Sequence, residues 1–335
     1  MNSASEIREF LASRRAKVTP EQAGIPRYGR HRRVSGLRRE EVALLANISV
    51  EYYTRLERGN GRGVSDEVLE SVSRALQLDE AEHAHLLDLI RASRSDRRAR
   101  RSSTAQLVRP SVRRIVDAMA EIPAFVHNGR LDLLYLNDLA SALYSEQLDD
   151  PIRPPNAARF VFLDPRARRF YLEWETIAHD LVAALRGEAG RNPYDRDLAD
   201  LVGQLSVRSD EFRVRWASHD VRFHRSGTKR FHHPLVGDLT LAFESLQLPA
   251  DPGLTLITYS SEPGSSTEHA LGELADWVAT RRRLTAVGAD AHAEAEGSVT
   301  DSLLPLRDVT SRLRVLGEHL LGPAGDPGRS HRRLG

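Results

Sequence analysis

The sequence contains no cysteine and almost no lysine, and each absence narrows what the protein can be. Without cysteine there is no disulfide, no thiolate nucleophile and no cysteine-ligated zinc, which fits a reducing compartment. Lys17 and Lys229 are the only lysines among 48 basic residues, so arginine carries nearly all the positive charge. This bias is typical of GC-rich genomes, although the forked guanidinium of arginine also binds phosphate better than the lysine ammonium does.

Long apolar runs are missing as well. No stretch approaches the roughly 18 residues that a bilayer span needs. The first ten residues, MNSASEIREF, lack the apolar core of a signal peptide. We therefore expect a cytoplasmic protein with no membrane segment. The length of 335 residues suits two domains, and a hydrophobic content of 40% is enough for packed cores.

Positive charge is concentrated near the N-terminus. Residues 1–105 hold 20 Lys and Arg against 15 Asp and Glu, whereas the remainder holds 28 against 32. A basic N-terminal third on a nearly neutral chain indicates a polyanionic partner for that third alone.

Residues 1–92 have the pattern of five short helices. Apolar residues recur at helical spacing over 4–16, over 38–46 and over 49–59, and two further helices follow good capping signals at Ser65 and Asp79. In the second helix the residues expected to face inward are Val42, Leu45 and Ala46. Only a short turn separates the second helix from the third, as in a helix-turn-helix.

The third helix, SVEYYTRLERG, has two different faces and should end at Gly59. Ser49, Tyr53 and Leu56 share the face expected to pack inward, and Tyr52 lies on the flank. The outer face carries the side chains that suit base edges and phosphates, namely Glu51, Thr54, Arg55 and Arg58. An ordinary solvated helix face is the alternative.

The stretch 38–59, RREEVALLANISVEYYTRLERG, resembles the helix-turn-helix of phage-repressor-like, XRE-type bacterial regulators. Ala43 matches the small residue between the two helices, Ile48 matches the apolar turn position, and LERG matches the end of the third helix. The resemblance implies that the third helix enters the major groove of DNA. It also implies that Glu57 is structural and pairs with Arg14 or Arg15.

The same resemblance implies a set of residues that contact double-stranded DNA. Arg39 is placed at a phosphate. The full set on the two helices is Arg39, Ser49, Val50, Glu51, Tyr52, Thr54, Arg55 and Arg58. The link between the first and second helices is longer than is usual in the family and basic, which favours an arm that follows phosphates or enters a minor groove over a solvated loop. Its contributors are Arg30, Arg32 and Arg33.

Residues 93–105 are expected to form a basic linker, and an α+β domain follows over 106–275. AFVHNGRLDLLYL, at 124–136, predicts two strands around a tight Asn128-Gly129 turn. Helices are expected over 137–144, 165–187 and 195–206. Three antiparallel strands follow, with Leu239, Leu241 and Phe243 on one face. The predicted fold class is therefore an all-α helix-turn-helix bundle of five helices followed by a PAS-like domain with a five-stranded antiparallel sheet.

Phrases within the second domain resemble the ligand-binding domain of MmyB-like actinobacterial regulators. They include NDLA at 137–140, ARFVFLDP at 158–165, FYLEW at 170–174, EFRVRW at 211–216, GTKRFHHP at 227–234 and VGDLTL at 236–241. The resemblance implies a cytoplasmic transcription regulator whose PAS-like domain takes a small apolar, fatty-acid-like ligand and needs no other cofactor.

Two roles are open for the aromatic residues of this domain, lining a ligand cavity or filling an ordinary core. The residues concerned are Phe125, Tyr135, Trp174, Phe212, Trp216, Phe223, Phe243 and Tyr259. A histidine cluster is compatible with a metal or haem site. However, the neighbouring His232 and His233 should point to opposite faces of a strand, so no metal site is expected.

The leading interpretation is a homodimeric, sequence-specific DNA-binding regulator that is not an enzyme. One alternative is an enzyme that uses Asp220 with His219 and His224, although no nucleophile elbow, phosphate loop or metal-ligand spacing supports it. Another is a protein-interaction scaffold. Residues 276–335 form a C-terminal extension of open role, with one helix predicted over 303–321 and disorder elsewhere.

Overall fold

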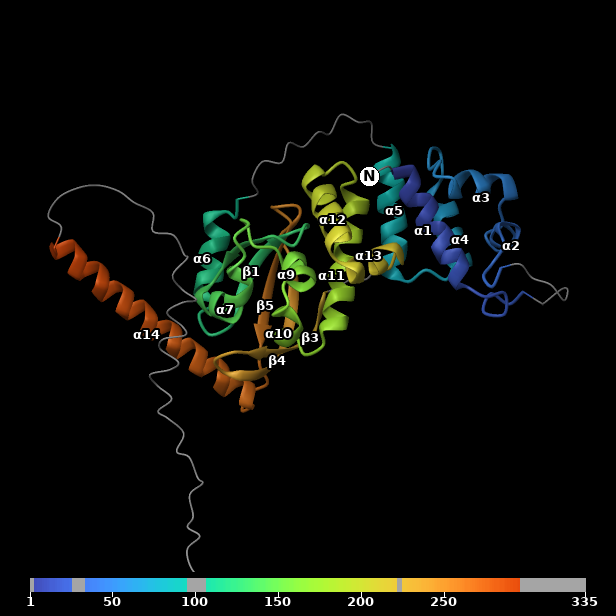
Figure 1. The fold of residues 1–335 in the computed structure, drawn as a ribbon. Coiled ribbons are helices and arrows are strands. Elements are labelled where there is room, and N and C mark those ends of the chain that lie inside the picture. The colour runs from blue at the N-terminus through green and yellow to red at the C-terminus, as the bar shows by residue number, and fades with distance from the viewer. Residues whose placement is uncertain (1–2, 26–33, 95–106, 222–224, 296–335) are drawn as a thin grey trace, which may run out of the picture. The chain divides into compact units, whose positions relative to one another are not determined.

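Two architectures follow one another along the chain, a bundle of helices and then a mixed α+β domain (Figure 1). The computed structural model describes residues 3–25, 34–94, 107–221 and 225–295. Residues 1–280 form one compact unit. Within the described residues, no helix combines the length and the apolar character that a bilayer span demands.

The helical bundle consists of five helices, as predicted. They are α1 (Ser3–Lys17), α2 (Arg39–Leu45), α3 (Val50–Glu57), α4 (Asp66–Ala75) and α5 (Glu80–Arg94). Their core is built from residues at helical spacing, among them Ile7, Phe10, Val42, Tyr53, Leu56, Leu69, Val72, Leu86 and Ile90. Tyr53 is fully buried, which confirms it as the core member of the tyrosine pair.

Two residues expected to face inward do not. The Ser49 side chain is exposed and caps α3, because its Oγ accepts the backbone N–H of Tyr52 at 3.1 Å. Leu45 is 38% exposed. At about 100° per residue, it falls on the flank of the stripe formed by Val42, Ala43 and Ala46.

The α+β domain, from α6 (Pro110–Ala118) to the start of α14 (Ser266–Ala295), is built on one five-stranded sheet, as predicted. Its strands are β1 (Ala124–Asn128), β2 (Leu133–Leu136), β3 (Ser226–His233), β4 (Gly237–Gln247) and β5 (Leu254–Ser260). They run antiparallel in the order β2-β1-β5-β4-β3. Leu239, Leu241 and Phe243 are buried on one face of β4, as their alternation predicts.

The first hairpin is wider than the Asn128-Gly129 dipeptide predicts. Asn128 is the last residue of β1, and residues 129–132 separate it from β2. Its side-chain oxygen accepts the backbone N–H groups of Arg130 and Asp132, each at 3.0 Å. This asparagine turn closes the longer loop and leaves Leu131 at a positive φ of 67°.

Helices cover both faces of the sheet, and further helices pack on these covering helices. They are α6 (Pro110–Ala118), α7 (Asp138–Leu143), α8 (Ser145–Leu148), α9 (Ala157–Leu163), α10 (Ala167–Phe170), α11 (Trp174–Arg191), α12 (Arg196–Arg208), α13 (Asp210–Ala217) and α14 (Ser266–Ala295). Val112 and Val116 of α6 pack with Val126 on one face. Helices α7, α9, α10 and α11 pack with Phe125, Leu241 and other residues of the opposite face.

The helix expected over 165–187 is divided in two. Tyr171, between α10 and α11, leaves the helical path to form a β-bridge with Phe231, and Leu172 donates its backbone N–H to the carbonyl of Arg230 at 3.1 Å. Pairing with β3 thus replaces helical hydrogen bonds at this point. The helix predicted over 303–321 lies outside the described residues, as do residues 95–105 of the expected linker.

Candidate nucleic-acid interface

Helix α3 is held against α2 by a close turn. Asn47 takes a positive φ of 54°, and Ile48 donates its backbone N–H to the carbonyl of Ala43 at 3.0 Å. Ala43 is fully buried, so its small side chain lets the two helices approach. The sequence therefore forms the turn of a helix-turn-helix in the expected place.

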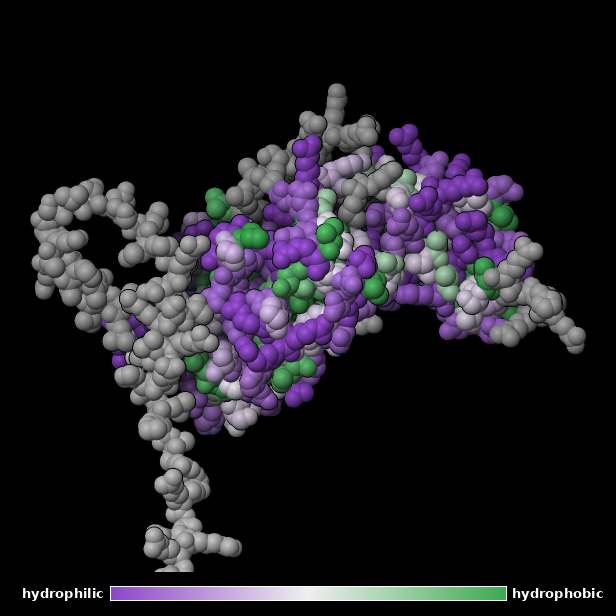
Figure 2. All heavy atoms as spheres, in the orientation of Figure 1, coloured by the Kyte–Doolittle hydropathy of each residue, from purple (hydrophilic) through white to green (hydrophobic). Residues whose placement is uncertain are grey.

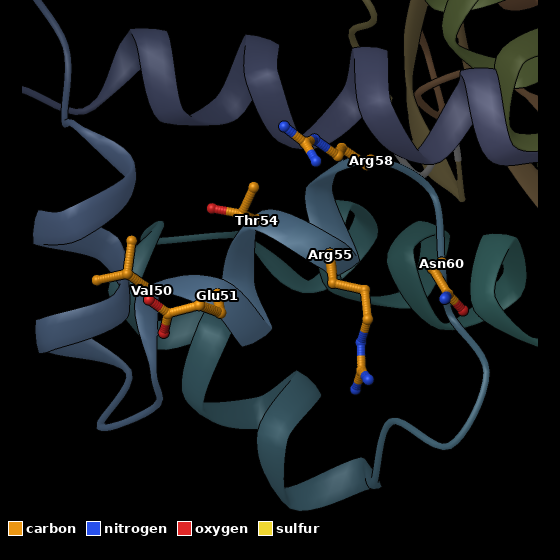
Figure 3. Close-up of a pocket in the computed structure, with 6 residues that line it drawn as sticks. All are labelled: Val50, Glu51, Thr54, Arg55, Arg58 and Asn60. Atoms are coloured by element: carbon orange, nitrogen blue, oxygen red, sulfur yellow. The ribbon is translucent and has the colours of Figure 1, made fainter.

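The exposed side of α3 forms a shallow depression on the surface of the bundle (Figure 3). Its lining residues are Val50, Glu51, Thr54, Arg55, Arg58 and Asn60. Five of these belong to the DNA-contacting set proposed from the sequence. Asn60 was missed because it follows the helix, and the signal that could have found it is its place directly after Gly59. Its backbone N–H donates to the carbonyl of Arg55 at 3.2 Å, which fixes the loop against the helix.

Arg55 is oriented by its neighbour on the flank. Its guanidinium carbon lies 4.9 Å from the centre of the Tyr52 ring, a cation–π contact. Tyr52 itself is half-buried and packs against the core of the bundle. The aromatic ring therefore limits where an exposed guanidinium can go before any partner binds.

Glu57 anchors α3 from below. The carboxylate is buried and accepts two hydrogen bonds from Arg15, at 3.0 Å from Nε and 3.1 Å from Nη2. Of the two arginines that the sequence left open, Arg15 is thus the partner. Arg39 also donates from Nε to Glu57 at 3.0 Å. Burial alone would raise the pKa of Glu57, but the hydrogen bonds and charges of the two arginines hold that pKa below its ordinary value.

Arg39 lies between the buried carboxylate of Glu57 and the solvent. Its side chain is 50% exposed although its guanidinium pairs with Glu57. It is the first residue of α2 and is followed in the first turn by Glu40 and Glu41. Arg30, Arg32 and Arg33 lie outside the described residues.

The surface of the bundle is mainly hydrophilic on the side shown in Figure 2, with small separate hydrophobic patches. Three exposed apolar side chains, Leu44, Leu45 and Val50, flank the turn between α2 and α3. An apolar group beside arginines and a carboxylate matches the mixture that the major groove presents, where thymine offers a methyl group.

The aromatic residues proposed for a ligand separate into three locations. Phe125, Trp174, Phe243 and Tyr259 belong to the core between the sheet and helices α7 to α11. Phe212 and Trp216 pack in the neighbouring cluster around α11 and α12. Tyr135 lies against α6 on the other face of the sheet, where its hydroxyl hydrogen-bonds to Asp117. Phe223 lies outside the described residues.

The core above the sheet also contains aromatic and polar groups that sequence reasoning missed. Tyr144, Phe170 and Phe231 contribute rings to it. The hydroxyls of Tyr144 and Tyr259 share a buried hydrogen bond of 2.6 Å. Lys229 Nζ lies 3.4 Å from the Tyr259 hydroxyl and 4.6 Å from the centre of the Phe243 ring.

The histidines in the described part of the chain do not assemble a metal site. His232 is exposed and pairs with Asp238 at 2.6 Å, whereas His233 is buried, which confirms that the two point to opposite faces. Among the described residues no group of three or more His, Asp or Glu side chains is placed to hold a metal. His224 lies outside the described residues.

Comparison with known families agrees with these two parts. A model of a helix-turn-helix domain matches residues 6–86, and a model of the MmyB-like transcription regulator ligand binding domain matches residues 108–274. No curated protein matches the chain. The chain belongs to the MmyB-like transcription regulators, as a DNA-binding protein with a helix-turn-helix domain and a ligand-binding domain.

Proposed function

We propose that the protein reads a specific DNA sequence through the outer face of α3. The observation that carries this proposal is the exposed depression in which Glu51, Thr54 and Arg55 stand side by side on one turn and a half of helix. Arginine bonds guanine in a bidentate way, glutamate accepts from the amino group of cytosine, and threonine bonds either kind of base. Val50, 42% exposed at the start of the helix, suits a thymine methyl group.

The residues at the edges of this face are proposed to bind the sugar–phosphate backbone and set the register. Arg39 and Arg58 supply the charge, and Asn60 is added to the set because it shares the depression. Ser49 and Tyr52 complete the contacts through the capped first turn of α3. The basic arm with Arg30, Arg32 and Arg33 is proposed to follow neighbouring phosphates.

We propose that the protein acts as a homodimer on a pseudo-palindromic operator. Helix α3 has only eight residues, and one such helix reads only a few base pairs. Two copies, placed on half-sites about 34 Å apart, would double the number of bases read. The boundary between the two domains is proposed to lie within residues 93–105. Residues 276–295, expected to be disordered, instead continue helix α14, and Trp277 and Val278 pack against the core of the ligand-binding domain. The proposed C-terminal extension therefore follows this helix.

For the ligand-binding domain we propose a small apolar, fatty-acid-like ligand. The support is the aromatic core above the sheet, into which Lys229 and the Tyr144–Tyr259 pair bring polar groups that suit a carboxylate head. Native mass spectrometry of gently purified protein should show an added mass of lipid size. An unliganded mass, with no thermal shift across a fatty-acid panel, would contradict this part of the proposal.

We propose further that the protein is cytoplasmic and is not an enzyme. Two of the residues considered for acid–base chemistry, His219 and Asp220, are engaged in other contacts. His219 Nε2 lies 3.3 Å from a carboxylate oxygen of Glu9, and Asp220 pairs with Lys17. Burial lowers the pKa of His219 to about 4, so the side chain is neutral at pH 7 and held in a structural contact.

A genome-wide DNA pull-down with the full-length protein tests the proposal. Fragments that share one motif, in two inverted copies, are expected. An absence of enriched fragments would return the scaffold and enzyme alternatives to consideration.

A further inference from the structure

Within the unit formed by residues 1–280, the ligand-binding domain packs directly on the helix-turn-helix domain. Helix α11 lies beside α5 (Figure 1), and the segment from α13 to Val221 contacts α1. This contact uses the side of the bundle formed by α1 and α5. Every residue that lines the depression on the outer face of α3 is on α3 or the loop after it, whereas Tyr194 of the ligand-binding domain shares a second depression with Arg58 and Asn60 at the edge of that face.

Arg186 of α11 is the centre of the contact. It is 2% exposed, and its Nη1 donates to a carboxylate oxygen of Glu6 on α1 at 2.8 Å. Its Nη2 donates to the backbone carbonyl of Trp216 in α13, and its guanidinium carbon lies 3.8 Å from the centre of the Trp216 ring. A charged pair formed by residues from different domains is therefore enclosed between them.

A second group of charges surrounds Arg14 of α1. Arg14 pairs with Glu82 of α5 and donates to the backbone carbonyl of His219. Its Nη2 also lies 3.3 Å from Asp220, which pairs with Lys17 as well. The segment after α13 is thus fixed to the bundle both by these charges and by Val221, which packs in the hydrophobic core of the bundle.

The hydrogen-bonding groups buried in this contact are not all paired. Four buried side-chain atoms in it lack a hydrogen-bond partner within the described part of the chain: Arg14 Nε, His85 Nδ1, Arg186 Nε and His219 Nδ1. Unpartnered polar atoms and enclosed charges are costly when buried and regain water when the surfaces separate. An interface of this composition is suited to open and close rather than to remain permanently closed.

Packed side chains connect this contact to both functional regions. On one side, the Trp216 ring stacks on Phe212 at 5.6 Å, and Phe162 links Phe212 to Trp174 in the core above the sheet. On the other side, the residue next to Arg14 is Arg15. Arg15 holds Glu57, which also holds Arg39 beneath the recognition helix.

We propose that this surface is a separable dock, with the ligand-binding domain as one half and the α1–α5 side of the helix-turn-helix domain as the other. Closing it fixes α1, and through Arg15 and Glu57 it fixes the position of α3. A ligand that moves α13 then changes DNA affinity by shifting the balance between docked and undocked chains. The coupling to DNA rests on the proposed function, whereas the dock itself does not.

The absence of cysteine makes the dock directly measurable. Cysteines placed at exposed Glu70 in α4 and exposed Val207 in α12 would carry spin labels for distance measurement by pulsed electron resonance in the full chain. A single narrow distance distribution is expected for the otherwise unaltered protein. Glu6→Leu and Arg186→Met should each add a broad population, because each leaves one charge enclosed without its partner.

The double variant Glu6→Leu with Arg186→Met should return to a narrow distribution, because neither charge then has to be buried. Lys17→Glu, at a half-exposed position that does not endanger either fold, should also broaden the distances through repulsion by Asp220. Arg208→Met, on the exposed side of α12, is the matched control and should change nothing. Single variants that stay folded and keep the narrow distribution would overturn the dock, as would a broad distribution in the starting protein.

Measuring the affinity for the operator distinguishes the dock itself from its coupling to DNA binding. We expect the three undocking variants to bind the operator with an affinity altered by about five-fold or more, while the double variant stays close to the unaltered protein. Unchanged affinity in variants with broadened distances would overturn the coupling and leave the dock. Narrow distances in a protein that enriches no DNA would sink the proposed function alone.

Discussion

At the scale of single residues, Glu57 links the fold to the proposed DNA-binding face. Its carboxylate is buried beneath α3 and is shared by Arg15 of α1 and Arg39 of α2. Two arginines on one carboxylate hold three helices together. Because only Arg39 is half exposed, only that guanidinium can also meet a phosphate.

Removing this carboxylate should destabilise the bundle. Glu57→Ala leaves Arg15 partly buried without its charge partner, and breaking a buried pair from one side costs about 3 kcal/mol. Urea denaturation followed by circular dichroism would measure the loss in the free energy of unfolding. A loss below about 0.5 kcal/mol, the range of ordinary surface substitutions, would show that Glu57 is not an anchor.

Arg39→Ala should weaken binding to every DNA sequence alike. A phosphate contact carries charge but no base information, so the slope of log affinity against log salt should fall by about one unit. Fluorescence anisotropy with operator and random duplexes at several salt concentrations would measure this. Arg208→Ala, on the ligand-binding domain, serves as the control, and a selective loss on the operator alone would contradict the phosphate role.

At the scale of elements, the end of α3 depends on a glycine for two separate reasons. Gly59 has a φ of +93°, and a Cβ there would stand 2.3 Å from the backbone oxygen of Ala4. The glycine therefore ends the recognition helix and also lets the start of α1 lie against it. Gly63, four residues on, has a φ of +72° but faces open space.

The pair of glycines gives a matched test. Gly63→Ala should cost about 1 kcal/mol of stability, since only the left-handed backbone is strained. Gly59→Ala should cost about 1–3 kcal/mol more, because the methyl group must displace backbone. Thermal and urea unfolding of both variants would show the difference. Equal losses would mean that the close approach to Ala4 relaxes without cost.

Local periodicity was enough to predict most elements but not their interruptions. The five helices of the bundle and the alternation on β4 follow from side chains that repeat within a few residues. The break between α10 and α11 depends on Tyr171 pairing with Phe231, sixty residues away in the sequence. Such long-range pairing is set by tertiary packing, which a single sequence does not display. The exposure of Leu45, in contrast, follows from its place on the flank of the buried stripe of α2.

The candidate site was predictable for the same reason that the bundle was. Projection of one helix separates the buried Tyr53 from the exposed Arg55, and capping explains Ser49 only once the first turn is seen. The contact between Glu6 and Arg186 could not be predicted, because it joins residues 180 positions apart on separate domains. No local pattern marks either residue as a partner of the other.

At the scale of the whole molecule, the buried His85 makes the free energy of unfolding depend on pH. Burial lowers the pKa of His85 to about 3, and the charges of Arg186, Arg191, Arg14 and His219 add to this effect. His85 packs edge-on against Phe10 and lies against Gly190 of the other domain. It is therefore neutral in the folded, docked chain.

The free energy of unfolding should fall as the pH drops from 6.5 toward the pKa of His85 in the folded chain, about 3. An unfolded histidine takes up a proton near pH 6.5, but His85 does not do so until about pH 3, so acid favours the unfolded or undocked chain. At pH 5 the effect of His85 amounts to about 2 kcal/mol. Urea denaturation at pH 7.5, 6 and 5 would measure it, with His85→Gln expected to show a flatter dependence. An equal pH dependence in the variant would contradict the role of His85.

The central claim concerns what the whole protein selects, namely a DNA sequence read by the outer face of α3. Arg55→Ala removes the guanidinium held over Tyr52 and leaves the core of the bundle untouched. The most direct measurement is the affinity of this full-length variant for the enriched operator and for random duplexes of equal length. We predict a loss of about 1–3 kcal/mol on the operator and a much smaller loss on random DNA, with relaxed preference at one base pair. An equal loss on both would contradict the account.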